Sequence, residues 1–362
     1  MKLLFVSYPV GPIGNGSGGG VDLTMHNAAK ALARRGHPVD VIAPVGSRLD
    51  HTRLIEVPGS LQPSAQYQTR GAPVSMPADS ILANMWEEAR RRQAAYDVLV
   101  NFAYDWLPFW VTPFFATPVA HLVSMCTLLD AMDGVIGAVA EAFPGRVAMH
   151  THAQAQTFPF AGDCPILGNG LDLDLYPYNP TPKNHLCWIG RIAPEKGLED
   201  AAAVAQATGI PLEVYGQIQD ADYWNRILRE FAGAPIQYNG FLDTGSLARA
   251  IGHAQAMLMT PKWIEAFGNV VMEALACGVP VVAYRRGGPA EMVAEGRTGW
   301  LVAPDSVDGL IAAVGRLNQL DRAVCRQQAE RDYSLEALGL RWERWLAGIV
   351  GSAGGFLAPV RA

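Results

Sequence analysis

The sequence predicts an α/β protein built from two doubly wound domains that face a central cleft. The chain has 362 residues, the length of two ordinary domains. Half of these residues are apolar, so each domain can bury a core of its own. Short runs rich in valine, isoleucine and leucine alternate with longer amphipathic stretches, a pattern typical of parallel strands covered by helices.

Apolar runs predict one series of strands in each half of the chain. The strands expected in the first half lie at 2–8, 38–43, 53–57, 97–102, 118–123, 146–150 and 165–168. Those expected in the second half lie at 185–190, 212–216, 236–240, 256–260, 279–284 and 300–302. Residues 21–35, after the first strand, have the apolar spacing of a helix. Each series is long enough for one doubly wound domain.

The expected first domain spans residues 1–175, and the second spans 176–340. A helix and tail at 341–362 are expected to pack back on the first domain. The boundary falls in 176–185, where three prolines in ten residues disfavour both helix and sheet. We expect that segment to be a linker. Two similar halves that face each other place a ligand cleft at the carboxyl ends of both sheets.

Charge and cysteine usage narrow the classes of function. The chain has 28 basic and 34 acidic side chains, a formal charge of −6, whereas a nucleic-acid-binding protein carries a basic face. The basic run at 90–92 is expected to be a solvated helix face. Five cysteines without a C-x-x-C pair indicate a reduced, cytoplasmic protein. We expect no nucleic acid among the partners, and the composition leaves the oligomeric state open.

One uncharged stretch is long enough to cross a bilayer. Residues 106–129 carry no charged side chain, but Pro108, Pro113 and Pro118 interrupt them. Because a spanning helix tolerates one proline better than three, we expect a buried loop followed by a strand. Residues 1–7 are expected to form the first strand rather than an export signal. The sequence therefore predicts no stable membrane insertion.

Glycines crowd the loop between the first strand and the helix at 21–35. They let the backbone approach a ligand, and the free N–H groups at a helix start favour an anion. Gly19 and Gly20 stand directly before the helix. The spacing differs from G-x-G-x-x-G, and a flexible loop is the alternative interpretation.

Two cations follow the first strand of the second half. Arg191 and Lys196 lie between Gly190 and Gly197, at the kind of strand-to-helix junction where open α/β sheets bind ligands. Together they could hold a diphosphate without a metal. Taken singly, they would be ordinary surface charges.

Two glutamates flank the start of a further helix. Gly268 and Asn269 open that helix, Glu265 precedes it, and Glu273 lies in its second turn. The two carboxylates can address opposite ends of a ligand, and carboxylates accept hydrogen bonds from sugar or ribose hydroxyls. A solvated helix glutamate is the alternative for either one alone. A second glycine turn into a helix follows at 285–291.

In this order and spacing, the motifs resemble the retaining nucleotide-sugar glycosyltransferases of family four, whose GT-B architecture consists of two Rossmann-like domains facing a central cleft. The resemblance covers essentially the whole chain and includes residues 168–172. Its most specific part is the E-x7-E element at 265–273, together with residues 274–282.

The resemblance implies a donor site that uses no metal and no further cofactor. It implies that Gly19 and Gly20 approach the diphosphate of a nucleotide sugar and that Arg191 and Lys196 neutralise it. It assigns the ribose to Glu273. The residues implied to hold the sugar or complete the donor site are consecutive: Glu265, Ala266, Phe267, Gly268, Asn269 and Val270.

The chain departs from the family at one position. Members usually carry a histidine after the strand that corresponds to 118–123, and the equivalent position here is Ser124. His121 lies three residues earlier. Either His121 has taken over the contact with the donor sugar, or it is an ordinary core histidine. The implied catalytic set is therefore Glu265, Arg191 and Lys196, with His121 or Ser124.

The first half supplies candidates for an acceptor site. Residues 101–115 hold seven aromatic side chains and a single acid, Asp105. Aromatic walls and one carboxylate suit a flat, nitrogen-rich acceptor, and packing of a large core is the alternative. The candidate acceptor residues are Gly16, Ser17, Tyr104, Asp105, Trp106, His121, Ser124 and Met125.

This half is also similar to the cyanobacterial UDP-glucose:tetrahydrobiopterin glucosyltransferases, at residues 18–21, 81–86 and 120–125. That resemblance implies glucose transfer from UDP-glucose to a pterin, with an α-glucosyl product. Two other hypotheses remain. The protein could transfer sugar to a lipid or polysaccharide at a membrane surface, or it could bind sugar nucleotides without turnover.

Overall fold

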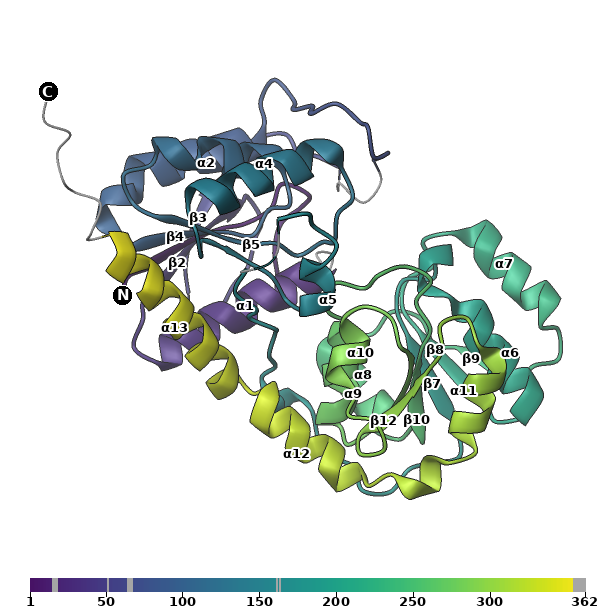
Figure 1. Cartoon of the computed structure of the whole chain (residues 1–362). Helices are drawn as coiled ribbons and strands as arrows, with labels where there is room; N and C mark the ends of the chain where they lie inside the picture. The colour runs from purple at the N-terminus through teal and green to yellow at the C-terminus, as the bar shows by residue number, and fades with distance from the viewer. Residues whose placement is uncertain (15–18, 51, 64–67, 161, 163, 354–362) are drawn as a thin grey trace, which may run out of the picture. The chain divides into compact units, whose positions relative to one another are not determined.

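A computed structural model describes residues 1–14, 19–50, 52–63, 68–160, 162 and 164–353. The chain divides into two units, which consist of Met1–Asn169 with Leu335–Ala362, and of Gly170–Ser334. Each unit contains one six-stranded parallel sheet with helices on both faces (Figure 1). The predicted fold class, two doubly wound Rossmann-like units, is confirmed.

The sheet of the first unit has the strand order β3-β2-β1-β4-β5-β6. Its strands are β1 (Leu3–Val6), β2 (Val39–Pro44), β3 (Arg53–Val57), β4 (Val98–Asn101), β5 (Val119–Leu122) and β6 (Val147–Ala148). Its helices are α1 (Gly19–Arg34), α2 (Ile81–Arg92), α3 (Trp106–Val111), α4 (Asp130–Ala142), α5 (His152–Ala155) and α13 (Leu335–Ala353). The 3-10 turns η2 (Gln93–Ala95) and η3 (Thr112–Phe114) follow α2 and α3. The central strands are apolar and fully buried, as expected where helices cover both faces.

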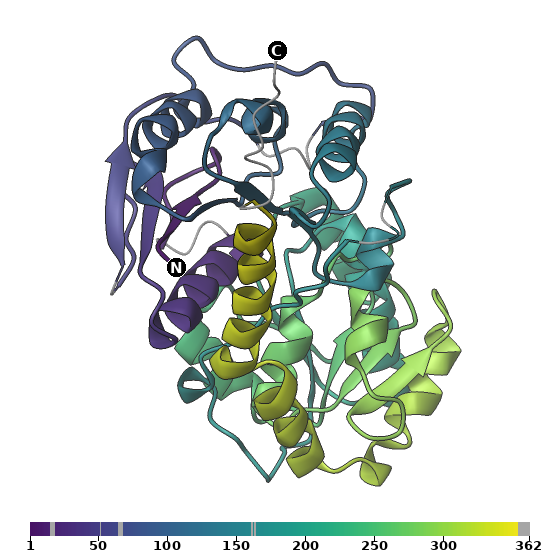
Figure 2. The ribbon, with the colours of Figure 1, turned by 60° about the vertical axis from the view of Figure 1, so that its left-hand side comes forward.

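The last helix of the chain returns to the first unit. Helix α13 packs beside α1, as Figure 2 shows for the yellow and purple helices. Its Trp342 is fully buried and stacks on Phe102 with ring centroids 5.8 Å apart. Arg341 donates to the carbonyl of Leu167, and Arg35 pairs with Glu343. This helix therefore completes the core of the first unit.

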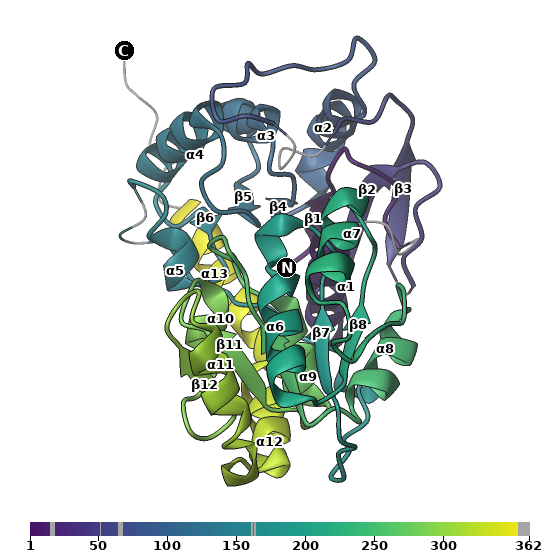
Figure 3. The same cartoon turned by 90° about the vertical axis from the view of Figure 1, so that its right-hand side faces the viewer.

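The sheet of the second unit has the order β12-β11-β10-β7-β8-β9. Its strands are β7 (Leu186–Ile189), β8 (Leu212–Tyr215), β9 (Ile236–Tyr238), β10 (Ala256–Met259), β11 (Val281–Tyr284) and β12 (Gly299–Val302). Its helices are α6 (Leu198–Thr208), α7 (Ala221–Glu230), α8 (Thr244–Ile251), α9 (Asn269–Ala276), α10 (Gly288–Met292), α11 (Val307–Val314) and α12 (Arg322–Asp332). Short 3-10 turns are η5 (Leu173–Leu175), η6 (Pro194–Lys196) and η7 (Leu317–Gln319). Helix α6 packs against β7 and β8, and α9 packs against β10 and β11 (Figure 3).

Two local expectations are corrected. The strand expected at 165–168 is a single parallel bridge between Met149 and Ile166, because Pro165 has no N–H with which to extend the pairing. The loop expected after residue 106 is the short helix α3. Its Pro108 lies in the first turn, where a helix tolerates proline.

Two observations concern the expected absence of membrane insertion and of a nucleic-acid-binding face. No helix in the described ranges is long and apolar enough to cross a membrane. Arg90 and Arg91 pair with Glu87, and Arg92 pairs with Glu88, all on α2. The basic run therefore forms the solvated helix face that the sequence predicts.

The proline-rich segment 176–185 contains no helix or strand and belongs to the second unit. Tyr176 is buried there, and its carbonyl accepts a hydrogen bond from Arg326 of α12 at 2.7 Å. The segment expected as a linker is thus packed within the second unit.

Candidate functional site

Two loops of the second unit bring an ion pair together at one edge of the sheet. Residues 190–197 follow β7 and residues 260–268 follow its neighbour β10, so both loops leave the carboxyl ends of adjacent parallel strands. Lys196 Nζ lies 2.6 Å from Glu265 Oε2, and their side chains are only 17% and 16% exposed. Two residues that the sequence singles out, 69 positions apart, are therefore in direct contact.

Trp263 completes this ion pair. Its indole Nε1–H donates to Glu265 Oε2 at 2.9 Å, and Lys196 Nζ lies 4.6 Å from the centroid of the indole ring. Burial alone would raise the pKa of Glu265, but the charge and hydrogen bond of Lys196 and the indole N–H lower it overall. Glu265 is therefore an ionised carboxylate held from two sides.

Backbone contacts fasten the two loops to each other. Gly197 has φ +67°, and a Cβ there would lie 2.0 Å from the carbonyl oxygen of Thr260, so only glycine fits. Thr260 Oγ1 donates to the Gly197 carbonyl at 2.7 Å, and Lys262 N donates to the Glu195 carbonyl at 2.9 Å. Backbone contacts between the two loops thus fix the position of Lys196 opposite Glu265.

The glycine turn at 285–291 packs closely against the backbone of the loop that carries Glu265. Gly288 N donates to the Glu265 carbonyl at 2.8 Å. A Cβ on Gly287 would lie 2.6 Å from that same carbonyl oxygen, and one on Gly288 would lie 2.3 Å from the carbonyl oxygen of Phe267. Arg286 donates to the Pro261 carbonyl at 2.7 Å and pairs with Asp305. The glycine turn at 285–291 therefore shapes the loop that carries Glu265.

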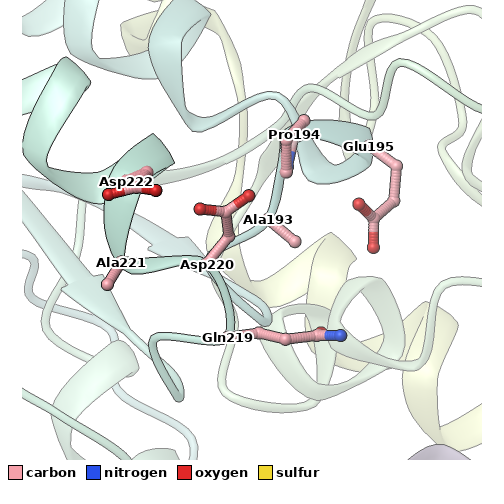
Figure 4. A pocket seen from close by; sticks show the side chains of 7 residues that line it. All are labelled: Ala193, Pro194, Glu195, Gln219, Asp220, Ala221 and Asp222. Carbon is pink, nitrogen blue, oxygen red and sulfur yellow. The ribbon is translucent and has the colours of Figure 1, made fainter. Parts of the chain in front are cut away.

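Arg191 points toward the loop that follows β8. It donates to the Gln219 amide oxygen and, at 3.1 Å, to Glu195. Both partners line a hollow together with Ala193, Pro194, Asp220, Ala221 and Asp222 (Figure 4). Its three carboxylates make this hollow acidic, so it does not suit an anion itself. Arg191 is the cation beside it.

Helix α9 begins where the sequence predicts, at Asn269, with Gly268 in the left-handed conformation before it. The segment Ala266–Val270 leads into this helix start, where the positive end of the helix dipole favours an anion. In the second turn, Glu273 is 8% exposed and accepts a hydrogen bond from the Tyr176 hydroxyl at 3.2 Å. Burial raises the pKa of Glu273 to about 7, although the Tyr176 hydroxyl opposes this shift.

The remaining donor candidates lie in the first unit. Gly19 and Gly20 begin α1, and Gly19 has φ +63° with open space where a Cβ would stand. Gly16 and Ser17 lie outside the described residues.

His121 is a core residue of the first unit. It is fully buried on β5, where its Nδ1 lies 3.2 Å from Asn101 Nδ2 and its Nε2 lies 2.8 Å from Thr112 Oγ1. Its ring stacks on Phe109 with centroids 4.3 Å apart. Burial lowers the pKa of His121 to about 3, so the ring is neutral. Of the two alternatives for His121, the core histidine describes the structure.

Ser124 lies two residues beyond the end of β5. Its Oγ is buried and has no hydrogen-bond partner among the described residues. The carbonyl of the adjacent Met125 accepts a hydrogen bond from Gln154 Nε2 at 2.9 Å. Ser124 therefore has a buried hydroxyl without a partner in the described chain, whereas the Met125 backbone is structural.

Three acceptor candidates line one hollow of the first unit. Tyr104, Asp105 and Trp106 share it with apolar neighbours that include Val74 and Met132. Burial raises the pKa of Asp105 to about 6, although the backbone N–H groups of α3 oppose the shift. Gln62 Nε2 donates to Asp105 at 3.3 Å, and no cation pairs with this carboxylate in the described part of the chain.

Some aromatic residues of the segment 101–115 pack in the core, and others line the hollow or reach the surface. Phe102 and Phe109 are buried core residues. Trp106 stacks on Trp110 with ring centroids 5.4 Å apart, and Trp110 and Phe114 are 49% and 66% exposed. Core packing thus accounts for Phe102 and Phe109, and Phe115 packs partly buried against the same core as Phe102. Tyr104 and Trp106 line the hollow, and Trp110 and Phe114 reach the surface.

Sequence reasoning missed Trp263, Gln219 and Tyr176. Each contacts a predicted site residue from a position without a motif. Trp263 stands two residues before Glu265, which is the only signal that could have found it.

Comparisons with known proteins find a family match within the second unit. Residues 178–332 match the family described as Glycosyl transferases group 1. A glycogen synthase of Mycobacterium tuberculosis is 32% identical over 171 residues, which cover 43% of this chain and 40% of that protein. A D-inositol 3-phosphate glycosyltransferase of an Arthrobacter species is 33% identical over 182 residues, which cover 46% of this chain and 42% of that protein. The chain therefore spans less than half the length of these curated relatives.

Solved structures resemble the whole chain. AviGT4, a glycosyltransferase involved in avilamycin A biosynthesis, has a TM-score of 0.73 at 19% identity and covers 97% of this chain and 98% of its own. HepE of Anabaena, solved with UDP and glucose, has a TM-score of 0.76 at 17% identity and covers 96% and 99%. At such identities the likeness establishes the fold alone. The protein has the GT-B fold, and its residues 178–332 match the glycosyl transferases of group 1.

Proposed function

We propose that this protein is a retaining glycosyltransferase that moves glucose from UDP-glucose to a small hydroxylated acceptor. The observation that carries the proposal is the ion pair of Lys196 and Glu265 at the start of α9, with Glu273 one helical turn further on. It supplies a cation for a diphosphate and two carboxylates for hydroxyl groups. These groups lie within the segment that matches the glycosyl transferases of group 1.

Each residue of the donor site has a role in this proposal. Arg191 and Lys196 neutralise the diphosphate. Glu265 accepts hydrogen bonds from the sugar, with the backbone of 266–270 beside it, and Glu273 accepts them from the ribose. Side chains and a helix start stabilise the leaving group, so the proposed reaction needs no metal.

The proposed transfer takes place on one face of the sugar. The acceptor oxygen bonds to the anomeric carbon as the bond between that carbon and the phosphate oxygen breaks. The departing phosphate oxygen takes the proton of the acceptor hydroxyl. No protein nucleophile takes part, and the anomeric configuration is retained.

Tetrahydrobiopterin is our first choice of acceptor. In this proposal a flat ring stacks on Trp106 or Tyr104, and its N–H groups donate to Asp105, the buried carboxylate without a cationic partner in the described chain. The hollow that these residues line has a volume of only about 30 Å³, so it must widen to admit the ring. The sequence resemblance to the pterin glucosyltransferases supports the same choice.

A second candidate is transfer to a lipid or polysaccharide at a membrane surface. The exposed rings of Trp110 and Phe114, which continue outward from Trp106, favour it. Binding of sugar nucleotides without turnover is the third, because Ser124 replaces the usual histidine.

A matrix of nucleotide sugars against acceptors separates these functions. We expect mass spectrometry to detect a product heavier by one hexose with UDP-glucose and reduced pterins. Transfer only to lipid extracts or glycans would favour the second candidate. Binding of UDP-glucose with neither transfer nor slow donor hydrolysis would leave a binding protein.

A further inference from the structure

We infer that Trp263 is a positioning residue that determines which oxygen of Glu265 is presented to the donor sugar. The inference rests on the proposed function, because it concerns how the site recognises its hexose. Trp263 belongs to no motif of the sequence. It contacts both members of the ion pair, through its N–H and through its ring face.

The hydrogen bonds of Glu265 are unevenly distributed between its two oxygens. Lys196 Nζ and Trp263 Nε1 both donate to Oε2, at 2.6 and 2.9 Å. Oε1 accepts no hydrogen bond from the described residues. An ionised carboxylate has room for about four donors, so Oε1 is the oxygen left for a hydroxyl of the sugar.

Lys196 cannot fix this orientation by itself once a donor is bound. A lysine ammonium is a flexible point charge with three rotatable donors, and in the proposed function it turns to the diphosphate. The indole N–H is a single donor of fixed direction, so it keeps Oε2 occupied when Lys196 shares its charge. The indole face also keeps the ammonium near the carboxylate while it does so.

The backbone under Trp263 is fixed, which a positioning role requires. The adjacent Lys262 pairs with Asp200 and Asp305, and its N–H donates to the Glu195 carbonyl. Arg286 holds the Pro261 carbonyl and also pairs with Asp305. The indole therefore acts from an anchored segment.

The variant Trp263→Phe tests the inference, because it keeps an aromatic face for Lys196 and removes the N–H. We expect kcat/KM for UDP-glucose to fall about tenfold, while the affinity for UDP stays within about twofold of wild type. We also expect a weaker preference for UDP-glucose over donors that lack or invert one hydroxyl, such as UDP-galactose and deoxyglucose donors. In a Glu265→Gln background, the same change is expected to add little.

Trp300→Phe is the matched control. Trp300 lies in the same unit, and its buried Nε1 has no hydrogen-bond partner among the described residues, so removing that N–H removes no hydrogen bond. A phenyl ring at this position still offers a face to Arg316, whose guanidinium lies 4.1 Å from the centroid of the Trp300 ring. Trp263→His places a ring N–H back at the position and is expected to recover part of the donor preference. It also provides a second variant if Trp263→Phe lowers the melting temperature.

Three results distinguish the possibilities. Loss of donor discrimination in Trp263→Phe, with UDP affinity retained and the control unchanged, supports the inference. Unchanged discrimination and unchanged kcat/KM in a folded Trp263→Phe overturn it. If neither the wild type nor the Trp300→Phe control binds UDP, the proposed function itself fails, and the inference fails with it.

Discussion

Replacing Glu273 with glutamine is expected to make the protein more stable at high pH. Burial raises the pKa of this carboxyl from 4.5 to about 7 in the folded state. The difference corresponds to about 3 kcal/mol, which is the cost of ionising Glu273 in its folded surroundings. Because the folded pKa is raised, the stability that the neutral form contributes is fully present below pH 4.5 and is lost as the pH rises through 7. Glutamine stays neutral throughout, and its carbonyl can still accept the hydroxyl hydrogen of Tyr176.

Denaturation by urea and thermal melting between pH 5 and pH 8.5 measure this effect. We expect Glu273→Gln to match the wild type near pH 5 and to exceed it by up to about 3 kcal/mol at pH 8.5. The matched control is Glu230→Gln, on the exposed part of α7, where only a 3.4 Å contact to Arg226 is lost. Parallel pH profiles for Glu273→Gln and the wild type would refute the burial argument.

At high pH, Glu273→Gln is expected to lower the affinity for UDP, although it raises the stability of the protein. If ribose hydroxyls donate to the ionised Glu273, the affinity of the wild type for UDP rises as the pH increases through 7. The glutamine variant lacks the charge, so its affinity is expected to be lower at pH 8, by about 1.5 to 3 kcal/mol, and independent of pH. Calorimetry with UDP at pH 6 and pH 8 measures the pH dependence of the wild-type affinity and the affinity lost in the variant. Equal affinities in the two proteins at pH 8 would remove Glu273 from the nucleotide site.

The other site residues should fail in different ways. Arg191→Ala and Lys196→Ala are each expected to lower kcat/KM by roughly 10² or more, since each removes charge that stabilises the leaving diphosphate; steady-state kinetics test this, and near-normal values in both would end the diphosphate assignment. Glu265→Gln is expected to bind UDP nearly as the wild type does in calorimetry and to turn over slowly; equal losses in both measurements would contradict its place at the sugar. Asp105→Asn and Trp106→Ala are expected to raise the acceptor KM and spare the donor KM. The wild-type acceptor affinity should also fall as the pH drops through about 6, because a protonated Asp105 accepts an N–H without the help of its charge. Melting curves alongside would reveal a purely structural role, in which both substrates are affected alike.

Local sequence predicts the elements of this fold well, because most strands are short runs rich in valine, isoleucine and leucine between helix-like stretches. It also places the start of α9 at Asn269, where the preceding Gly268 takes a left-handed conformation. The strand at 165–168 fails because apolar composition does not show whether a partner strand is long enough to pair, and β6 has only two residues.

The contacts of the site depend on strand order, which the sequence does not reveal. Lys196 meets Glu265 because β7 and β10 are neighbours in the sheet, although β8 and β9 lie between them in the chain. The core role of His121 could not be predicted from the sequence either, because its two hydrogen-bond partners come from β4 and from the turn after α3. The sequence shows which residues are close together within a motif. Contacts between distant segments form only when the strands take their order in the sheet.

The central claim is the transfer of glucose with retained configuration, and proton NMR of a single reaction tests it most directly. The wild-type protein is incubated with UDP-glucose and tetrahydrobiopterin in the presence of excess EDTA. We expect the anomeric signal of the donor to be replaced by that of a new α-glucoside while UDP accumulates. A β-glucoside, or turnover that appears only after Mg²⁺ or Mn²⁺ is added, would contradict the proposed mechanism, and an unchanged donor signal with every acceptor of the matrix would contradict the transfer itself.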